Sequence, residues 1–329
     1  MLDIPLLGKI WFCIPSGSST SLYEDWIRNE LDIPAELIFT GATAPTLALG
    51  AASAYRNDVI CVFPGAYLQA AELAWSKANT HMVGLGGPNQ GGDWSEPNVV
   101  IYTTGTALAS VLNVTGQNCV FRGITFDNYG ANAACVSAVK VNKYAATFID
   151  CQIAGNMLSQ QDASANCCSL WIAEAGMYPK FINCQIGQDV WGNRTTANAG
   201  VIKYETTSGA SAGRPNGSDF INCRILSTGD DANCAMVRVT AATAIGRGHR
   251  FDNCIFSHFS ANAAGTQTLA KAFYTPSTAV QRHIIHLHNC MAIGIDEWQT
   301  DDDIVVMADM PIVGTGGGLA RNPTTVTGS

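Results

Sequence analysis

Charge is scarce in this sequence of 329 residues, and basic charge is the scarcer kind. Asp, Glu, Lys and Arg together make up 13% of the chain, and 26 acidic residues against 18 basic ones give a net charge of −8. Nucleic-acid binding needs a basic face, which a chain of this balance does not supply. We therefore expect no nucleic-acid partner.

Long apolar runs are missing too, although 47% of the residues are hydrophobic. No run is long enough to cross a bilayer as a helix. Residues 1–9 contain no basic region followed by an apolar core, which is the pattern of a secretion signal. These absences predict no membrane partner and synthesis in the cytoplasm.

The usual cysteine motifs are absent, although the chain contains 12 cysteines. No CxxC pairs with a second one, so the adjacent Cys167 and Cys168 do not indicate a zinc site. Five other cysteines belong to a repeated phrase and would stack on one inner face. Free cysteine packs as a small hydrophobe, and we therefore expect a column of reduced thiols in the core. Such thiols fit synthesis in a reducing cytosol.

That phrase is the dominant feature of the sequence. It reads Phe, a variable residue, Asn or Asp, Cys, a variable residue, and an apolar residue, and its copies start 27 to 39 residues apart. The first copy has Gly123 at the corner and no cysteine. The copies occupy residues 121–126, 148–153, 181–186, 220–225, 251–256 and 287–292. A repeat of this period predicts a solenoid, in which each unit buries its apolar face against its neighbours.

Within the phrase, apolar residues recur at every second position, which indicates strands. Asn and Asp tolerate left-handed backbone and suit a tight corner between two short strands. A further strand is expected before each phrase, at residues 136–141, 169–172, 201–204, 236–239, 270–274 and 304–307. We therefore predict an all-β chain, a right-handed parallel β-helix with three short strands per coil.

The chain should divide into an N-terminal arm with a short helical cap (residues 1–57), the β-helix (58–307) and a C-terminal arm (308–329). Ser21 starts a capping-box spacing, and Leu22, Trp26, Ile27 and Leu31 would share one helical face. A second helix is expected from Pro45 to about residue 57. Both helices would cover the open end of the solenoid.

Residues 57–67 open the solenoid with an Asp, a strand and the motif Pro64-Gly65-Ala66-Tyr67. This stretch resembles the opening of the pectin-lyase-like right-handed parallel β-helix superfamily, and the resemblance covers roughly residues 45–295. The arrangement of residues 9–13 before a Ser/Gly loop also resembles β-helical virion proteins of tailed phages. The resemblance implies a fold but no particular activity, because one fold carries many chemistries.

Polygalacturonase-like members of the superfamily pair two Asp residues with a later Gly-His-Gly. Asp230 and Asp231 followed by His249 have the right order, and two carboxyl groups are what inverting glycoside hydrolysis requires. Arg250, however, stands in place of the last glycine, and the other family motifs are missing. A solvated turn for the two acids and an outward strand position for His249 are the alternative interpretation.

His283, His286 and His288 lie within six residues. Leu287 takes the inward position, so His286 and His288 should point outward on the same side of one strand. Paired imidazoles can bind a metal, and surface or interface residues are the alternative. An outward aromatic row of Trp171, Trp191 and Tyr204 could stack on sugar rings or anchor a subunit contact.

From these observations we expect a structural virion protein of a tailed phage rather than an enzyme. The expected role is capsid decoration (cement), and the expected partners are further copies in a homotrimer and the major capsid protein. We expect no cofactor, and location in the virion after synthesis in the host cytoplasm. The alternative is a tailspike-like protein that binds or hydrolyses a host glycan through Asp230, Asp231 and His249.

Overall fold

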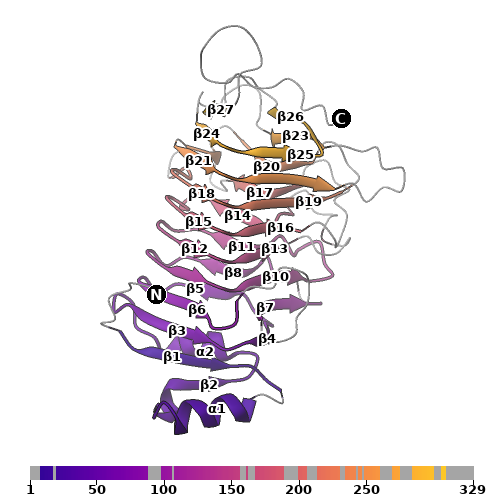
Figure 1. Ribbon diagram of the computed structural model, residues 1–329. Helices are drawn as coiled ribbons and strands as arrows, with labels where there is room; N and C mark the ends of the chain where they lie inside the picture. The colour runs from indigo at the N-terminus through magenta and orange to yellow at the C-terminus, as the bar shows by residue number, and fades with distance from the viewer. Residues whose placement is uncertain are drawn as a thin grey trace.

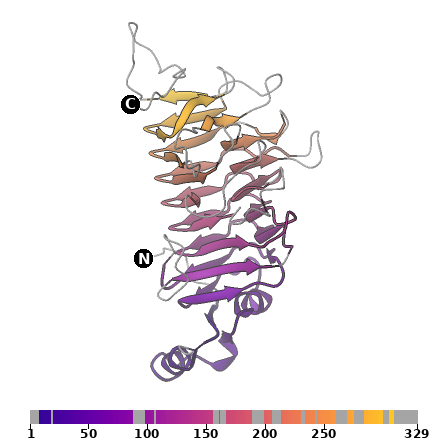
Figure 2. The same ribbon diagram turned by 90° about the vertical axis from the view of Figure 1, so that its right-hand side faces the viewer.

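The computed structural model shows an elongated stack of coils, with the N-terminal helices at one end and residues 305–308 at the other (Figures 1 and 2). It describes residues 8–17, 20–87, 98–105, 107–155, 161, 167–188, 199–205, 213–229, 234–241, 244–246, 248–259, 269–274, 284–299 and 305–308. No helix among them is long and apolar enough to cross a membrane.

Three parallel sheets run the length of the stack, with 11, 8 and 8 strands in the described residues. Sheet 1 contains, in spatial order, β2 (Ile38–Thr40), β1 (Ile10–Ile14), β3 (Asp58–Val62), β6 (Thr80–Gly84), β9 (Val120–Arg122), β12 (Thr147–Ile149), β15 (Lys180–Ile182), β18 (Asp219–Ile221), β21 (His249–Asp252), β24 (Ile285–His288) and β27 (Val305–Ala308). Sheet 2 contains β4 (Gly65–Leu68), β7 (Val99–Thr104), β10 (Thr125–Tyr129), β13 (Gln152–Ala154), β16 (Gln185–Gly187), β19 (Arg224–Thr228), β22 (Ile255–Phe259) and β25 (Met291–Ile293). Sheet 3 contains β5 (Leu73–Trp75), β8 (Ser110–Val114), β11 (Ser137–Val141), β14 (Leu170–Ala173), β17 (Gly200–Glu205), β20 (Ala235–Val239), β23 (Leu269–Tyr274) and β26 (Ile295–Gln299).

Each coil visits the sheets in the order 1, 2, 3, and every strand pairs with its counterparts in the coils before and after it. The chain is therefore a right-handed parallel β-helix with three strands per coil, as the repeat predicts. The repeated phrase supplies the sheet 1 strand, the corner and the sheet 2 strand of its coil. Loops of different length follow the sheet 2 and sheet 3 strands, which accounts for the uneven spacing of the copies.

The phenylalanines of the phrase form a continuous stack inside the solenoid. Ring centroids of Phe148 and Phe181 are 5.1 Å apart, those of Phe181 and Phe220 are 4.8 Å apart, and those of Phe220 and Phe251 are 4.4 Å apart. These rings are within 9° of parallel. The separations match the roughly 4.8 Å between neighbouring strands, so in-register pairing itself brings the rings into contact.

The N-terminal end of the core is covered by α2 (Ala44–Ala51), whose Ala44, Ala48 and Leu49 are buried against β1, β2 and β3. The helix α1 (Thr20–Asn29) lies on the other side of β1, where Ile27 packs in a separate cluster with Phe12 and Ile14. A short 3₁₀ turn (Ala35–Leu37) leads into β2. The helical cap is thus provided by α2, while α1 packs against the outward-facing side chains of β1.

Asp58 joins the N-terminal segment to the first coils. Its buried carboxylate accepts hydrogen bonds from the backbone N–H groups of Lys9 and Ser53, from Trp11 Nε1 and from the guanidinium of Arg56, at 2.5 to 3.2 Å. Burial acts to raise the pKa of Asp58, but the donors outweigh it and lower that pKa to about 2. The carboxylate therefore stays charged and holds residues 9–11 and 53–56 together.

The motif at residues 64–67 closes the same region. Gly65 has a φ of +137°, and a Cβ at this position would lie 2.5 Å from Cγ of Pro15. The buried Tyr67 hydroxyl donates its hydrogen toward the carbonyls of Cys13 and Phe63, both at 2.9 Å. The glycine permits the close approach of the two segments, and the tyrosine fastens them.

Several element predictions need correction. The strand expected at residues 304–307 is β27, which pairs with β24 in sheet 1 rather than extending sheet 3. The helix α1 starts at Thr20, before the predicted cap at Ser21, and of its expected apolar face only Ile27 is buried. The helix α2 ends at Ala51, well short of residue 57. The domain boundaries at residues 57 and 307 stay predictions. Two strands that precede residue 57, β1 and β2, already pair in sheet 1.

Candidate functional site

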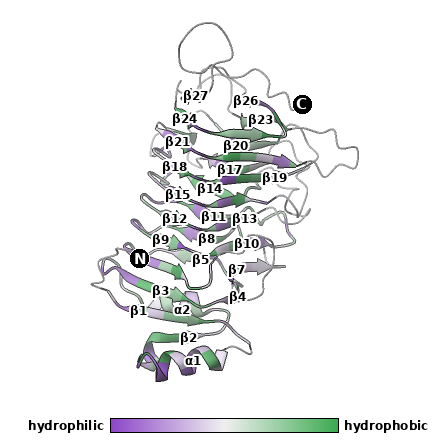
Figure 3. Cartoon of the chain, in the orientation of Figure 1, coloured by the Kyte–Doolittle hydropathy of each residue, from purple (hydrophilic) through white to green (hydrophobic). Residues whose placement is uncertain are grey.

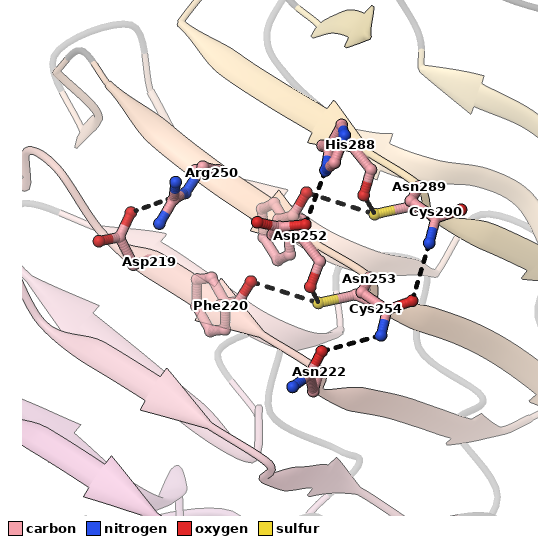
Figure 4. A network of polar contacts seen from close by, with 11 residues as sticks. Asp219, Phe220, Asn222, Arg250, Asp252, Asn253, Cys254, His288, Asn289 and Cys290 are labelled. Carbon is pink, nitrogen blue, oxygen red and sulfur yellow. Dashed lines mark hydrogen bonds and ion pairs between the residues drawn. The ribbon is translucent and has the colours of Figure 1, made fainter. Parts of the chain in front are cut away.

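The corner between sheets 1 and 2 carries one left-handed residue in every phrase. The φ angles are +52° at Asp150 and +49 to +54° at the asparagines, and Gly123 takes the place in the first copy with +68°. The asparagines are Asn183, Asn222, Asn253 and Asn289. Each donates its side-chain N–H to the corner residue of the preceding coil, at 2.8 to 3.2 Å. Figure 4 shows the last three asparagines in line. The predicted corner ladder is confirmed.

Directly behind the ladder lies the predicted thiol column, with Cys151, Cys184, Cys223, Cys254 and Cys290 all buried and free. Each Sγ lies 3.3 to 3.5 Å from the carbonyl oxygen of the phrase's first residue in the preceding coil. Burial raises the pKa of the Cys184 thiol well above its ordinary value. These thiols therefore act as buried donors that link one coil to the next.

His249 lies inside the solenoid and not on its surface. It is two residues before Phe251 on β21, so both side chains point inward, and the outward position expected for it is wrong. Its Nδ1 is 2.6 Å from Oγ of Ser218, which is 2.5 Å from the hydroxyl of Tyr204. All three residues are fully buried. Burial lowers the pKa of His249 to about 4, so the ring is neutral at physiological pH.

This arrangement brings a serine beside an imidazole, but at a place that no substrate reaches. The chain of hydroxyls and imidazole pairs the Tyr204 hydroxyl, the Ser218 hydroxyl and His249 Nδ1 inside the core, where polar groups need partners. Asp230 and Asp231, the predicted catalytic partners of His249, lie outside the described residues. The structure therefore places His249 in a core hydrogen-bond network with Ser218 and Tyr204.

His286 and His288 point outward from β24, as predicted. His288 Nδ1 lies 2.7 Å from Oδ1 of Asp252 on the neighbouring strand, as Figure 4 shows, and His286 is exposed. His283 lies outside the described residues. Within the described residues, no group of three or more His, Cys, Asp or Glu side chains is placed to hold a metal ion.

The outer face of sheet 3 carries a column of cationic and aromatic side chains. Strand register places Lys140 beside Trp171, Trp171 beside Lys203, Lys203 beside Arg238, and Arg238 beside Tyr274. Lys140 Nζ is 3.9 Å from the Trp171 ring centroid, and Arg238 Cζ is 4.2 Å from that of Tyr274. Both distances are typical of cation–π contacts.

Lys203 is the buried member of this cation–aromatic column, and its Nζ pairs with Glu205 at 2.9 Å. Sequence reasoning found only Trp171 of this column, because these residues lie on five separate coils. Of the other aromatic residues expected in an outward row, Tyr204 points into the core and Trp191 is outside the described residues. Aligning the strands by register would have found the column.

Exposed large apolar side chains gather toward the two ends of the stack. In the described part of the chain, those between residues 86 and 254 are only Tyr144 and Tyr178. The others belong to the N-terminal quarter, residues 22–85, or to the last coils. The members in the last coils are Ile255 and Phe259 on β22 and Met291 and Ile293 on β25. Figure 3 shows α1 as a mixture of strongly hydrophobic and hydrophilic residues.

Comparison with known proteins finds likeness in structure alone. No protein-family model and no curated protein matches the sequence. A pectin methylesterase solved with a bound hexasaccharide superimposes with a TM-score of 0.51 at 15% identity, over 87% of this chain and 81% of that one. Pectate lyase Pel9A gives a TM-score of 0.46 at 14% identity, over 87% and 76%.

A phage protein is also among the similar structures. ORF18 of Geobacillus virus E2 gives a TM-score of 0.40 at 11% identity, over 81% of this chain and 57% of that one. Identities this low inform on architecture and leave the chemistry open. With three parallel sheets, an Asn/Asp corner and the superposition on the pectin methylesterase, the chain has the pectin-lyase-like right-handed parallel β-helix fold.

Proposed function

We propose that this chain is a structural virion protein of a tailed phage, a capsid decoration (cement) protein that assembles as a homotrimer and binds the major capsid protein. The observation that carries the proposal is the concentration of exposed apolar side chains, among the described residues, toward the two ends of the stack. Exposed apolar clusters on a folded chain favour protein–protein contacts. A rigid solenoid that makes contacts at its ends suits a part of a larger assembly.

The buried thiols support the same proposal. All 12 cysteines are free, and 11 of them are buried. A core of this kind folds in a reducing compartment, as does a virion protein made in the host cytoplasm before particle assembly.

The test is electron cryomicroscopy of particles of the virus that encodes the chain, at side-chain resolution, beside particles from a deletion strain. Threefold density on the shell lattice, absent from the deletion strain, is the expected result. Particles that lack the protein would overturn the proposal. Density confined to the tail would replace decoration by receptor binding.

The cation–aromatic column on sheet 3 favours a second candidate function, binding of an anionic host glycan. Lys140 and Arg238, each held over an aromatic ring, are the cations that would pair with sugar carboxylates. The test is binding of acidic polysaccharides to the Trp171→Ala variant, with Tyr144→Ala as an aromatic control outside the column. Loss of binding in the first variant alone would support this function.

Hydrolysis of the glycan is a further, separate part of that candidate. It would depend on Asp230 and Asp231, and not on His249, since that ring is buried. Release of reducing sugar that disappears in Asp231→Asn would support it, and equal release by the variant would remove it.

A further inference from the structure

Residues 20–40, here called the end lobe, contain α1, the 3₁₀ turn and β2 and project from the N-terminal end of the stack (Figure 2). Of these 21 residues only Ile27 is buried. A helix of 10 residues has little stability of its own in water and depends on packing of its apolar face. The end lobe thus depends on a small cluster in which Ile27 packs against Phe12, Ile14 and Phe63.

Three of its large apolar side chains face solvent. Leu22 is 68% exposed and Trp26, one helical turn later, is 45% exposed, while Leu31 just after the helix is 43% exposed. Leu22 and Trp26 are four residues apart and therefore lie on one face of α1. Trp26 also contacts Phe63 edge-on, with centroids 6.1 Å apart, so its ring is already oriented. An oriented, half-exposed tryptophan is a typical anchor of a protein interface.

The end lobe is held in place at both of its ends. The Thr20 hydroxyl donates to the carbonyl oxygen of Pro15 at 2.7 Å, and β2 pairs in parallel with β1. The backbone N–H of Gly41 donates to the carbonyl oxygen of Ile14 at 2.9 Å. The apolar face of α1 is therefore presented in a fixed position, so that little order has to be gained on binding.

The charge of the end lobe says what kind of surface fits it. The lobe has five carboxylates, at Glu24, Asp25, Glu30, Asp32 and Glu36, and one basic residue, Arg28, which pairs with Glu24 at 2.5 Å. Asp25, Glu30, Asp32 and Glu36 are exposed. A net charge of −4 would make two such lobes repel each other and favours a basic partner.

We propose that the end lobe is the docking element of this protein, and that its partner is a protein surface with an apolar depression rimmed by Lys and Arg. The identity of the partner rests on the function proposed above: the surface belongs to the major capsid protein. Trp26 and Leu22 would enter the depression, and the carboxylates would lie against its rim. The solenoid then stands away from the shell with its C-terminal coils outermost.

The experiment adds purified full-length protein to particles of the deletion strain and measures co-sedimentation at two salt concentrations. Trp26→Ala should weaken binding by roughly 30-fold or more, as loss of an interface anchor does. Leu22→Ser should weaken it as well, and its thermal unfolding should stay at the wild-type temperature because the side chain is so exposed. Tyr144→Ala, which removes a ring of matched exposure (43%) in the middle of the stack, should bind as the wild type does.

Two further measurements address the charge. Wild-type binding should weaken as salt rises, and the double variant Glu30→Gln/Asp32→Asn should bind more weakly and with less dependence on salt. Wild-type protein that binds while Trp26→Ala and Leu22→Ser bind equally well would overturn the end lobe as docking element. A change of oligomeric state in these variants would show that a second copy covers it instead. Wild-type protein that does not bind particles would overturn the proposed function and the shell as partner.

Discussion

One residue in each phrase adopts a backbone conformation that most side chains avoid. A left-handed φ costs an ordinary L-residue about 1–2 kcal/mol, while glycine adopts it freely and asparagine compensates by hydrogen bonding. Asn222 has a φ of +54° and its amide bonds to Asn183 and Asn253. At the corner of the first copy, Gly123 adopts the same left-handed conformation without a side chain that could hydrogen-bond.

We predict that Asn222→Ala lowers the free energy of unfolding by about 1–2 kcal/mol, because alanine suffers the left-handed strain and cannot continue the ladder. Asn222→Gly should lower the free energy of unfolding by less, because glycine loses the ladder hydrogen bonds but adopts the left-handed conformation without strain. Urea unfolding of the two variants provides the comparison. Equal losses would mean that the hydrogen bonds, and not the backbone, explain the asparagine.

His249 should make stability depend on pH. Its pKa is 6.5 when unfolded and about 4 when folded, so in mild acid the unfolded chain binds a proton that the folded chain does not. Stability is therefore complete above pH 6.5 and is lost as pH falls toward 4, by about 2–3 kcal/mol at pH 4.5.

The measurement for His249 is urea unfolding between pH 7.5 and 4.5. His249→Gln should be less stable at pH 7.5, because the bond to Ser218 is disturbed, but should show a shallower decline in acid. Parallel pH profiles of wild type and variant would contradict the assignment.

The phrase allowed the inward and corner residues to be predicted, since its period and its Asn/Asp position have direct structural causes. The role of His249 was beyond such reasoning. Asp230 and Asp231 precede it in an order that also occurs in enzymes, and only the alternation from Phe251 back to residue 249 indicates burial. Its partners Ser218 and Tyr204 belong to other strands, which no local pattern connects.

At the scale of elements, the junction of β1 with β3 depends on the carboxylate of Asp58. It receives donors from residues on both sides of the junction. Removal of this acceptor leaves buried N–H groups unsatisfied, a costly situation in a core.

We predict that Asp58→Ala lowers the free energy of unfolding by about 3 kcal/mol, and Asp58→Asn by less because one acceptor oxygen remains. Cleavage by trypsin near Lys9 and Arg56 should become faster in both variants. The matched control is Asp219→Ala. The Asp219 carboxylate lies on the outer face and makes one long ion pair, 3.4 Å from Arg250 Nε. Equal behaviour of Asp58→Ala and Asp219→Ala would refute the role of Asp58.

Element prediction succeeded where the repeat was complete and failed at both ends of the stack. Residues 304–307 carry the alternation of a strand, but alternation does not say which of three sheets a strand joins. The register with Leu287 and His288 settles that question. The spacing of Leu22, Trp26 and Ile27 predicts one apolar helical face, but not that most of it stays uncovered.

At the scale of the whole molecule, the 12 cysteines contribute to one reduced core. We predict that the native protein, purified without reductant, reacts with a disulfide reagent at no more than one thiol within minutes, namely the half-buried Cys61. Twelve thiols should react after unfolding in urea. Fewer than twelve would reveal disulfides and would contradict a reduced core.

The in-register stack also bears on how long such a molecule can be. Because Asn183 and Asn222 occupy the same corner in successive coils, removal of residues 184–222 would join Asn183 to Cys223, its equivalent neighbour. A whole coil could be lost or duplicated in this way with the same cross-section and the same end surfaces. The reach of the molecule would change in steps of about 4.8 Å, so the repeat number acts as a molecular ruler.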